Sequence, residues 1–329
     1  MTETFSRDAA PGEVSEIADG VIAINAPFWG FPNVVYALMG DEDRFSLIDT
    51  GVSETPALAL DAFIREHGGY DAIRYVFGTH AHLDHIGGNA WIAERSSSAR
   101  FVIGAKDVAW AEDPDLHFEQ LYVHGCPGHW RPDAAAEAQI RRGIGSRVPV
   151  DVPLYGGERI VSDGRAVRAV ALGSHTPGQM LYVDEASGLA FTGDAIQGDG
   201  ALNDAGFRDF PMFGNIRDYR AALTRIRESG FELLCTAHAG VFDRAAGDRF
   251  LDDSLAFAAQ LDDELRQLAQ MLGSFALEGL VESYLTTHSE YANGLQIRVT
   301  LAEFANDLVA EGVLVPSFDD DVKVWTSTH

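Results

Sequence analysis

The ten residues Thr79–Gly88, THAHLDHIGG, hold three histidines and an aspartate within six consecutive positions. Side chains of an extended segment alternate between two sides, so His80, His82 and Asp84 would point the same way. His85 breaks this alternation, which predicts that the chain turns a corner there. Clustered imidazole and carboxylate groups of this kind are typical of a metal site.

Three further segments place a metal-type ligand at a turn or at the end of an apolar run. They are GSHTPGQ with His175, FTGDA with Asp194, and TAHAG with His238. With the first segment they give five histidines and two aspartates, a set that suits zinc, iron or manganese and needs no cysteine. Seven ligands are too many for one four-coordinate ion, and they fit two ions that share one carboxylate.

The composition limits the classes of partner. The chain has 329 residues and a net charge of −26, which argues against DNA or RNA as a partner. It contains no apolar run of the length that crosses a membrane, and its polar first residues lack a signal-peptide core. Two cysteines, Cys126 and Cys235, cannot form a disulfide framework, so we expect a cytoplasmic protein with a small-molecule substrate.

The elements that position these ligands can be predicted from hydrophobic patterning. Short runs with β pattern predict strands on both sides of a central region; they are Val21–Ala26, Asn33–Met39, Arg44–Thr50, Arg74–Thr79, Phe101–Ala105, Ala166–Leu172, Met180–Asp184, Leu189–Asp194 and Phe231–Ala237. Helices are predicted at Pro56–His67, Gly88–Arg95 and Ile216–Glu228. This order predicts an α/β fold in which two sheets pack face to face with helices outside.

Two regions differ from this pattern. Residues 112–157 are rich in His, Pro, Trp and Gly and predict an insertion that acts as a lid, with a helix near Pro132–Arg142. Strands are predicted to stop after Asp243, where leucines recur every three or four residues from Leu251 to Leu272. The sequence therefore predicts a first domain of residues 1–242 and a helical C-terminal extension of residues 243–329. The leucines are expected to pack on the chain's own helices, with a homodimer seam as the alternative to a monomer.

Five motifs in this order resemble the metallo-β-lactamase superfamily: LIDTG (Leu47–Gly51), THAHLDHIGG, SHTPGQ, TGD and AHAG. The resemblance covers roughly residues 14–245 and implies an αββα sandwich of two mixed sheets. It also implies two divalent metal ions, for which zinc is favoured over iron or manganese. It also implies a ligand set: one ion would be held by His80, His82 and His175, the other by Asp84, His85 and His238, with Asp194 between them.

The resemblance also bears on two residues that are not metal ligands, Asp49 and Gln179. Asp49 is expected to orient the ligand loop by accepting a hydrogen bond behind it, or alternatively to cap a turn. Gln179 departs from the pattern, because many hydrolytic relatives carry a histidine there behind the ligands. Metal binding is expected to survive that exchange.

Hydrolysis is the reaction implied by such a site, because two ions can bind a shared water and lower its pKa. Asp84 is predicted to ligate its metal and also to exchange a proton with the water and the leaving group.

The residues near Asp194 differ from those of two subfamilies. Many lactamases carry a cysteine where this chain has Asp194, and homoserine-lactone lactonases tend to carry a tyrosine where this chain has Gln197. The layout is similar to the quinolone-signal thioesterase type, which favours an ester, thioester or lactone. Iron in the same ligands would instead support oxygen chemistry, as in sulfur dioxygenases.

Aromatic residues near the predicted metals suggest a hydrophobic substrate. Phe28, Trp29 and Phe31 lie in a Gly- and Pro-containing loop between two early strands, and Phe207 and Phe213 follow Asp194. Ligand pockets are mostly apolar with a few polar groups. These five side chains are therefore predicted to form the substrate wall.

Overall fold

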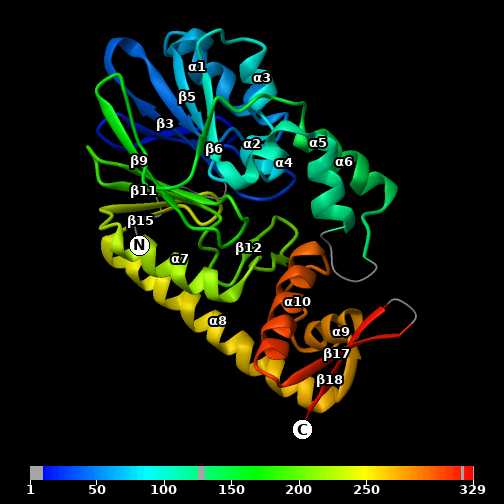
Figure 1. Ribbon diagram of the computed structural model, residues 1–329. Helices are drawn as coiled ribbons and strands as arrows, with labels where there is room; N and C mark the ends of the chain where they lie inside the picture. Colours follow the sequence, from blue (N-terminus) through cyan, green and yellow to red (C-terminus); the bar gives the residue numbers. More distant parts are fainter. Residues whose placement is uncertain (1–9, 125–129, 320–321, 329) are drawn as a thin grey trace.

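Two mixed β-sheets pack face to face between helices in the computed structural model, which describes residues 10–124, 130–319 and 322–328 (Figure 1). The first sheet has the order β1-β2-β3-β4-β5-β6-β7; its strands are β1 Val14–Ala18, β2 Val21–Asn25, β3 Val34–Met39, β4 Phe45–Ile48, β5 Ile73–Phe77, β6 Arg100–Gly104 and β7 Val152–Leu154. The second has the order β15-β14-β11-β10-β9-β8; its strands are β8 Arg159–Ser162, β9 Arg165–Ala171, β10 Met180–Asp184, β11 Leu189–Gly193, β14 Leu233–Thr236 and β15 Val241–Asp243. The predicted αββα sandwich is confirmed.

The alternation of side chains along the strands explains how the layers form. In β3, Tyr36 packs between the two sheets, whereas Val35 and Ala37 face the helical layer. In β10, Tyr182 faces the inter-sheet core and Leu181 faces the other way. Both faces of each sheet are thus buried, as an αββα architecture requires.

Helices cover the two outer faces of the sandwich. Apolar residues of α1 (Asp61–Glu66) and of the π-helical turn before it (Pro56–Leu60) pack on the first sheet, and α3 (Asn89–Ala93) adds Ile92. The second sheet is covered by α7 (Ile216–Glu228) and by the long helix α8 (Arg244–Leu272). The predicted helix Ile216–Glu228 has the bounds of α7.

The C-terminal region continues the second helical layer. The leucine stripe of α8 is buried within the chain, because Leu251, Leu261 and Leu265 are each at most 1% exposed and lie in the cluster that includes α7. Beyond α8 come α9 (Leu277–Thr287) and α10 (Leu295–Ala310). The prediction that strands stop after Asp243 is wrong, because a small sheet of order β16-β18-β17 follows; its strands are β16 Ser274–Ala276, β17 Leu314–Asp319 and β18 Val322–Ser327.

The region predicted as an insertion is mostly helical and lies beside the sandwich (Figure 1). It contains α5 (Pro114–Phe118), a π-helical segment (Glu119–His124) and α6 (Ala134–Ile144). Val152–Leu154 instead forms β7, which pairs with β6 in the first sheet. Three residues of the predicted insertion therefore belong to the first sheet.

No helix among the described residues is long and apolar enough to cross a membrane.

Candidate metal centre

The seven predicted ligands come from loops and one short helix that follow the strands. His80 and His82 lie just after β5, while Asp84 and His85 stand in α2 (Leu83–Ile86). The remaining three lie in the connections after β9, β11 and β14; they are His175, Asp194 and His238. The strand ends of both sheets thus bring together ligands that lie far apart in the chain.

The ligand side chains form two groups. His80, His82 and His175 make one group, and the other contains Asp84, His85, His238 and Asp194; in each, the candidate ligand atoms lie within 4.8 Å of one another.

The carboxylate of Asp194 faces both groups. Its Oδ2 is 3.6 Å from Nε2 of His175, while its Oδ1 is 3.2 Å from Nε2 of His238 and 3.4 Å from Nε2 of His85. This arrangement fits a dinuclear metal site with a shared carboxylate.

Unpartnered nitrogens inside the site test this fit. The Nε2 atoms of His80 and His85 are buried and have no hydrogen-bond partner among the described residues, whereas His82 turns its Nδ1 toward the group, 2.8 Å from Nε2 of His175. A buried polar atom without a partner costs stability, and a metal ion removes that cost. Burial lowers the pKa of both His80 and His82 well below the usual value, which keeps these imidazoles in the neutral form that ligates metals.

Electrostatics in the second group also favour a cation. Burial alone would lower the pKa of His238, but the carboxylates of Asp194 and Asp84 outweigh it and raise that pKa to about 10. The same negative charge would attract a divalent ion, which then replaces the proton.

Hydrogen bonds behind the ligands fix their orientation. Nδ1 of His85 donates to Asp49 at 2.8 Å, and Asp49 also accepts from the backbone N–H and the hydroxyl of Thr79, at 2.7 and 2.9 Å. Asp49 adopts a positive φ of 64°, unusual for a residue other than glycine, so the backbone is held in place by these bonds. Its carboxylate orients His85 and the start of the ligand loop, as a carboxylate behind a ligating histidine does.

Backbone carbonyls do the same for two other histidines. Nδ1 of His175 donates to the carbonyl of Met212 at 2.9 Å, and Nδ1 of His238 donates to that of Pro32 at 2.7 Å. In each ring the Nε2 atom is therefore the one turned toward the site.

Gln179 lies deeper than the ligands. Its side chain is fully buried, and its amide donates to the carbonyls of Thr192 and Met180, at 3.0 and 3.1 Å. It joins the ends of β10 and β11 rather than contacting a ligand side chain.

Two positioning residues were missed by sequence reasoning. Asp107 accepts hydrogen bonds from the N–H groups of Ala81 and Gly178, at 3.1 and 2.7 Å, and from the hydroxyl of Thr176 at 2.6 Å. It therefore ties the loop of His80 and His82 to the loop of His175. An isolated aspartate after a strand carries no motif that could have revealed this role.

Gln197, the second of these residues, stands out in the sequence only as a difference from lactonases. Its Nε2 is 3.3 Å from Oδ2 of Asp194, and its Oε1 accepts the N–H of Met212 at 2.6 Å. Because Met212 in turn holds His175, Gln197 couples two of the ligands.

A large cavity of about 1040 Å³ opens over the ligands. Its lining includes His82, Asp84, His175, Asp194 and His238. The predicted aromatic residues Phe28, Trp29 and Phe31 also line it, and the Phe28 ring lies 6.1 Å from the ring of His238. The insertion adds Leu121, Tyr122 and Trp130, and the C-terminal region adds Leu295 and Gln296.

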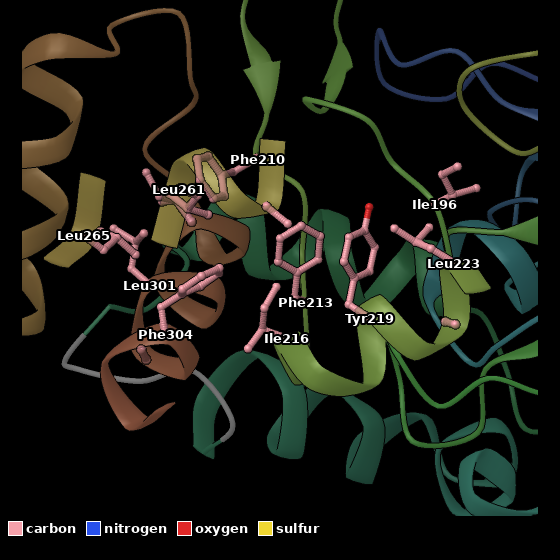
Figure 2. Packing of buried hydrophobic residues seen from close by; sticks show 14 of the residues in the cluster. Ile196, Phe210, Phe213, Ile216, Tyr219, Leu223, Leu261, Leu265, Leu301 and Phe304 are labelled. Carbon is pink, nitrogen blue, oxygen red and sulfur yellow. The ribbon is translucent and has the colours of Figure 1, made fainter. Parts of the chain in front are cut away.

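The prediction that Phe207 and Phe213 form part of the substrate wall is wrong. Phe213 is fully buried in the core beneath the cavity, with its ring 3.9 Å from that of Tyr219 (Figure 2). Phe207 is 49% exposed and does not line the cavity. The chain enters α7 directly after Phe213, which turns this ring toward the helix; Phe210 and Met212 line the cavity instead.

Comparisons with known proteins agree with this geometry. The family model described as the metallo-beta-lactamase superfamily matches residues 29–238. A metallo-beta-lactamase family protein from Thermus thermophilus has a similar structure, with a TM-score of 0.74 at 18% identity over 94% of this chain and 100% of the other. A beta-lactamase domain protein from Burkholderia ambifaria gives a TM-score of 0.65 at 19% identity over 98% of this chain and 96% of the other.

A subclass B3 metallo-beta-lactamase of Bradyrhizobium japonicum matches less of the molecule, with a TM-score of 0.54 at 20% identity over 80% of this chain and 97% of the other. A search of curated proteins found no match. The family match extends over well over half of the chain and contains all seven ligands of the two groups. The chain therefore belongs to the metallo-beta-lactamase superfamily.

Proposed function

We propose that the protein is a dinuclear metal-dependent hydrolase that cleaves an ester, thioester or lactone bond of a hydrophobic small molecule. The observation that carries this proposal is the pair of ligand groups facing one carboxylate, Asp194, on the floor of a large cavity with aromatic walls. The ligand chemistry suits two divalent ions, zinc first and iron or manganese as alternatives.

Bound metal ions would supply a water of lowered pKa and polarise the substrate's carbonyl oxygen. In this proposal, proton transfer and substrate binding are carried out by the chain's own residues. Asp84 lines the cavity beside His238, which supports a role in which its carboxylate accepts a proton from the attacking water and returns it to the leaving group. Phe28 and the other aromatic side chains hold the apolar part of the substrate and exclude water around the reacting bond.

The test combines metal analysis with a substrate screen. We expect two metal ions per chain and turnover of at least one member of a panel of p-nitrophenyl esters, acyl thioesters, lactones and phosphodiesters. His82→Ala should lower the metal content and abolish turnover, whereas His124→Ala, whose side chain is 76% exposed outside both groups, should change neither. A fully active His82→Ala protein would show that the site is not the reaction centre.

An iron-dependent oxygenase is the second candidate, because five imidazoles and two carboxylates without a cysteine also suit iron. Iron in the purified protein together with substrate-dependent oxygen consumption would favour it. Turnover of an ester by the zinc-loaded protein without oxygen uptake would favour hydrolysis.

We further propose a cytoplasmic protein that acts on a small molecule without nucleic acid or membrane partners. The burial of the α8 leucines inside the chain supports a monomer over a homodimer built on that stripe.

A further inference from the structure

Negative charge dominates the wall of the cavity. Among the described residues that line it there are six aspartates and one arginine. Two of the aspartates, Asp84 and Asp194, belong to the metal groups, and the arginine, Arg208, is paired with Asp199 at 2.8 Å. Among the described residues, the cavity therefore offers no free arginine or lysine to an anionic substrate.

Outside the metal groups, Asp209 is the one aspartate among the described lining residues that is not exposed. It lies in β13 (Arg208–Asp209), is partly buried, and makes no ion pair with an arginine or lysine of the described chain. Burial raises its pKa to about 6; His238 acts against this rise, and the carboxylates of Asp84 and Asp194 add to it. At neutral pH the side chain is still mostly ionised, and no arginine or lysine of the described chain is paired with it.

The C-terminal region holds Asp209 in position. Nε2 of Gln296, in the first turn of α10, donates to Oδ2 of Asp209 at 3.2 Å. The neighbouring backbone is fixed by two further bonds of 2.8 Å, from Arg208 N–H to the carbonyl of Glu290 and from Ala292 N–H to the carbonyl of Arg208. The carboxylate is thus part of a rigid wall rather than of a free loop.

Apolar side chains of the same cavity lie next to Gln296, because its neighbour Leu295 packs with Leu121, Tyr122 and Trp130. In such surroundings a charged carboxylate binds a cationic donor strongly and disfavours a second anion. A neutral alkyl chain placed here would leave Gln296 as the carboxylate's hydrogen-bond donor and bring no positive charge to it, which costs binding energy relative to an ammonium group.

We propose that Asp209 and Gln296 form a substrate subsite that binds a positively charged nitrogen, so that the substrate is a hydrophobic acyl compound bearing an amine. This inference rests on the proposed hydrolase function and adds the chemical class of the substrate. A carboxylate or phosphate on the same part of the molecule would be rejected.

The test uses the zinc-loaded full chain and p-nitrophenyl esters of straight acyl chains with four to eight carbons. At each length the chain ends in methyl, hydroxyl or dimethylamino, the last being protonated at neutral pH. We expect kcat/KM for the best dimethylammonium ester to exceed that of the methyl ester about tenfold or more, the scale of a charge-assisted hydrogen bond. Asp209→Asn should remove this preference by lowering kcat/KM for the dimethylammonium ester about tenfold or more.

Two further variants sharpen the result. Gln296→Met, which keeps the size of the side chain, should reduce the preference only in part. Asp204→Asn makes the same change of net charge at an exposed aspartate on the rim of the cavity and should keep the preference whole. Circular dichroism melts check that each variant is folded.

The outcomes separate this subsite from the general function. Hydrolysis of the methyl esters with no preference for the ammonium chain, or a preference that survives Asp209→Asn, overturns the subsite and leaves the hydrolase standing. If no ester is hydrolysed, calorimetric binding of the corresponding ω-dimethylamino acid and alkyl acid gives the answer. Equal affinities of the wild type for the two acids would then overturn the proposal, and tighter binding of the amino acid that is lost in Asp209→Asn would support it.

Discussion

Asp84 is the residue that distinguishes a proton-transferring site from a purely metal-holding one. Its Oδ2 lies 3.2 Å from Nε2 of His238, and its backbone carbonyl accepts from Nδ2 of Asn33 at 3.0 Å. The backbone is therefore anchored independently of the carboxylate, so the side chain can be changed with little effect on the fold.

We expect Asp84→Asn to retain at least one metal ion while kcat falls on the order of 100-fold or more, because the amide keeps the shape but loses the basicity. Metal content and kcat should be measured on the same preparation. A variant with both ions bound and near-normal kcat would assign Asp84 a structural role only.

His117 carries the clearest pH effect on stability. Its ring is fully buried, stacks on Trp110 at 5.5 Å, and neither nitrogen has a hydrogen-bond partner among the described residues. Burial lowers its pKa to about 4, only partly offset by Asp84. The unfolded chain binds this proton near pH 6.5 and the folded chain does not, so stability is lost as pH falls from about 6.5 towards 4.

We expect His117→Phe, which keeps an aromatic ring against Trp110, to reduce this loss. The difference in Tm between the variant and the wild type, measured by thermal melts, should be several degrees more favourable to the variant at pH 5 than at pH 7.5. The same difference at both values would show that His117 is not the group responsible.

At this scale the sequence predicts the ligands better than their supports. The seven ligands stand in short motifs, so spacing and residue type are enough to identify them. Asp107 and Gln197 act through contacts between loops far apart in the chain, which no local pattern encodes. Phe213 was misplaced because an aromatic residue in a loop can face either the cavity or the core.

At the scale of elements, α10 is joined to the loop that supports His175. The hydroxyl of Thr300 is fully buried, donates to the carbonyl of Pro211 at 2.8 Å and accepts the N–H of Phe213 at 3.0 Å. Met212, between these two residues, holds the His175 ring and lines the cavity. One side chain of the C-terminal region thus fixes both a ligand support and part of the wall.

Thr300→Val keeps the shape and removes both bonds, leaving two backbone groups without partners. We expect a loss of about 1–3 kcal/mol in the free energy of unfolding and a higher KM, measured by chemical denaturation and steady-state kinetics. Thr300→Ser keeps the hydroxyl and is the matched control. Equal stability of the Val and Ser variants would mean that these bonds contribute nothing measurable.

The strands of the C-terminal region show where sequence patterns mislead. Pro316 interrupts the apolar run in β17 and argues against a strand, because proline cannot donate to a sheet. β17 is an edge strand in the order β16-β18-β17, and an edge tolerates proline. The long helix α8 was predictable because its leucines repeat over many turns, which gives a much stronger signal.

At the scale of the whole molecule, the sandwich and the C-terminal region share one hydrophobic core. The cluster joins Leu234 of β14 and Leu223 of α7 with Leu251 of α8 and Leu301 of α10 (Figure 2 shows part of it). The leucine stripe predicts that Asp243–His329 packs against the first domain, and this cluster agrees with that prediction. Which residues meet depends on contacts between distant segments, which no local pattern encodes.

Truncation after Asp243 should therefore expose the outer face of the second sheet. We expect the shortened protein to aggregate on expression or to melt well below the full chain, as measured by solubility and calorimetry. The full chain expressed in parallel is the control. A soluble fragment with unchanged substrate preference would make the extension an independent appendage.

The metal ligands and the wall residues of the cavity come from different segments of the chain, so evolution or engineering can change them separately. The ligands lie at strand ends, whereas one part of the wall comes from the segment before α6 and from α10. Random replacement of Leu121, Tyr122, Trp130 and Leu295 can then diversify what is accepted without touching the groups that perform the reaction. A library confined to these four positions should yield many active clones with altered substrate profiles. The substrate selectivity of the protein can therefore change while its metal site and its reaction stay the same.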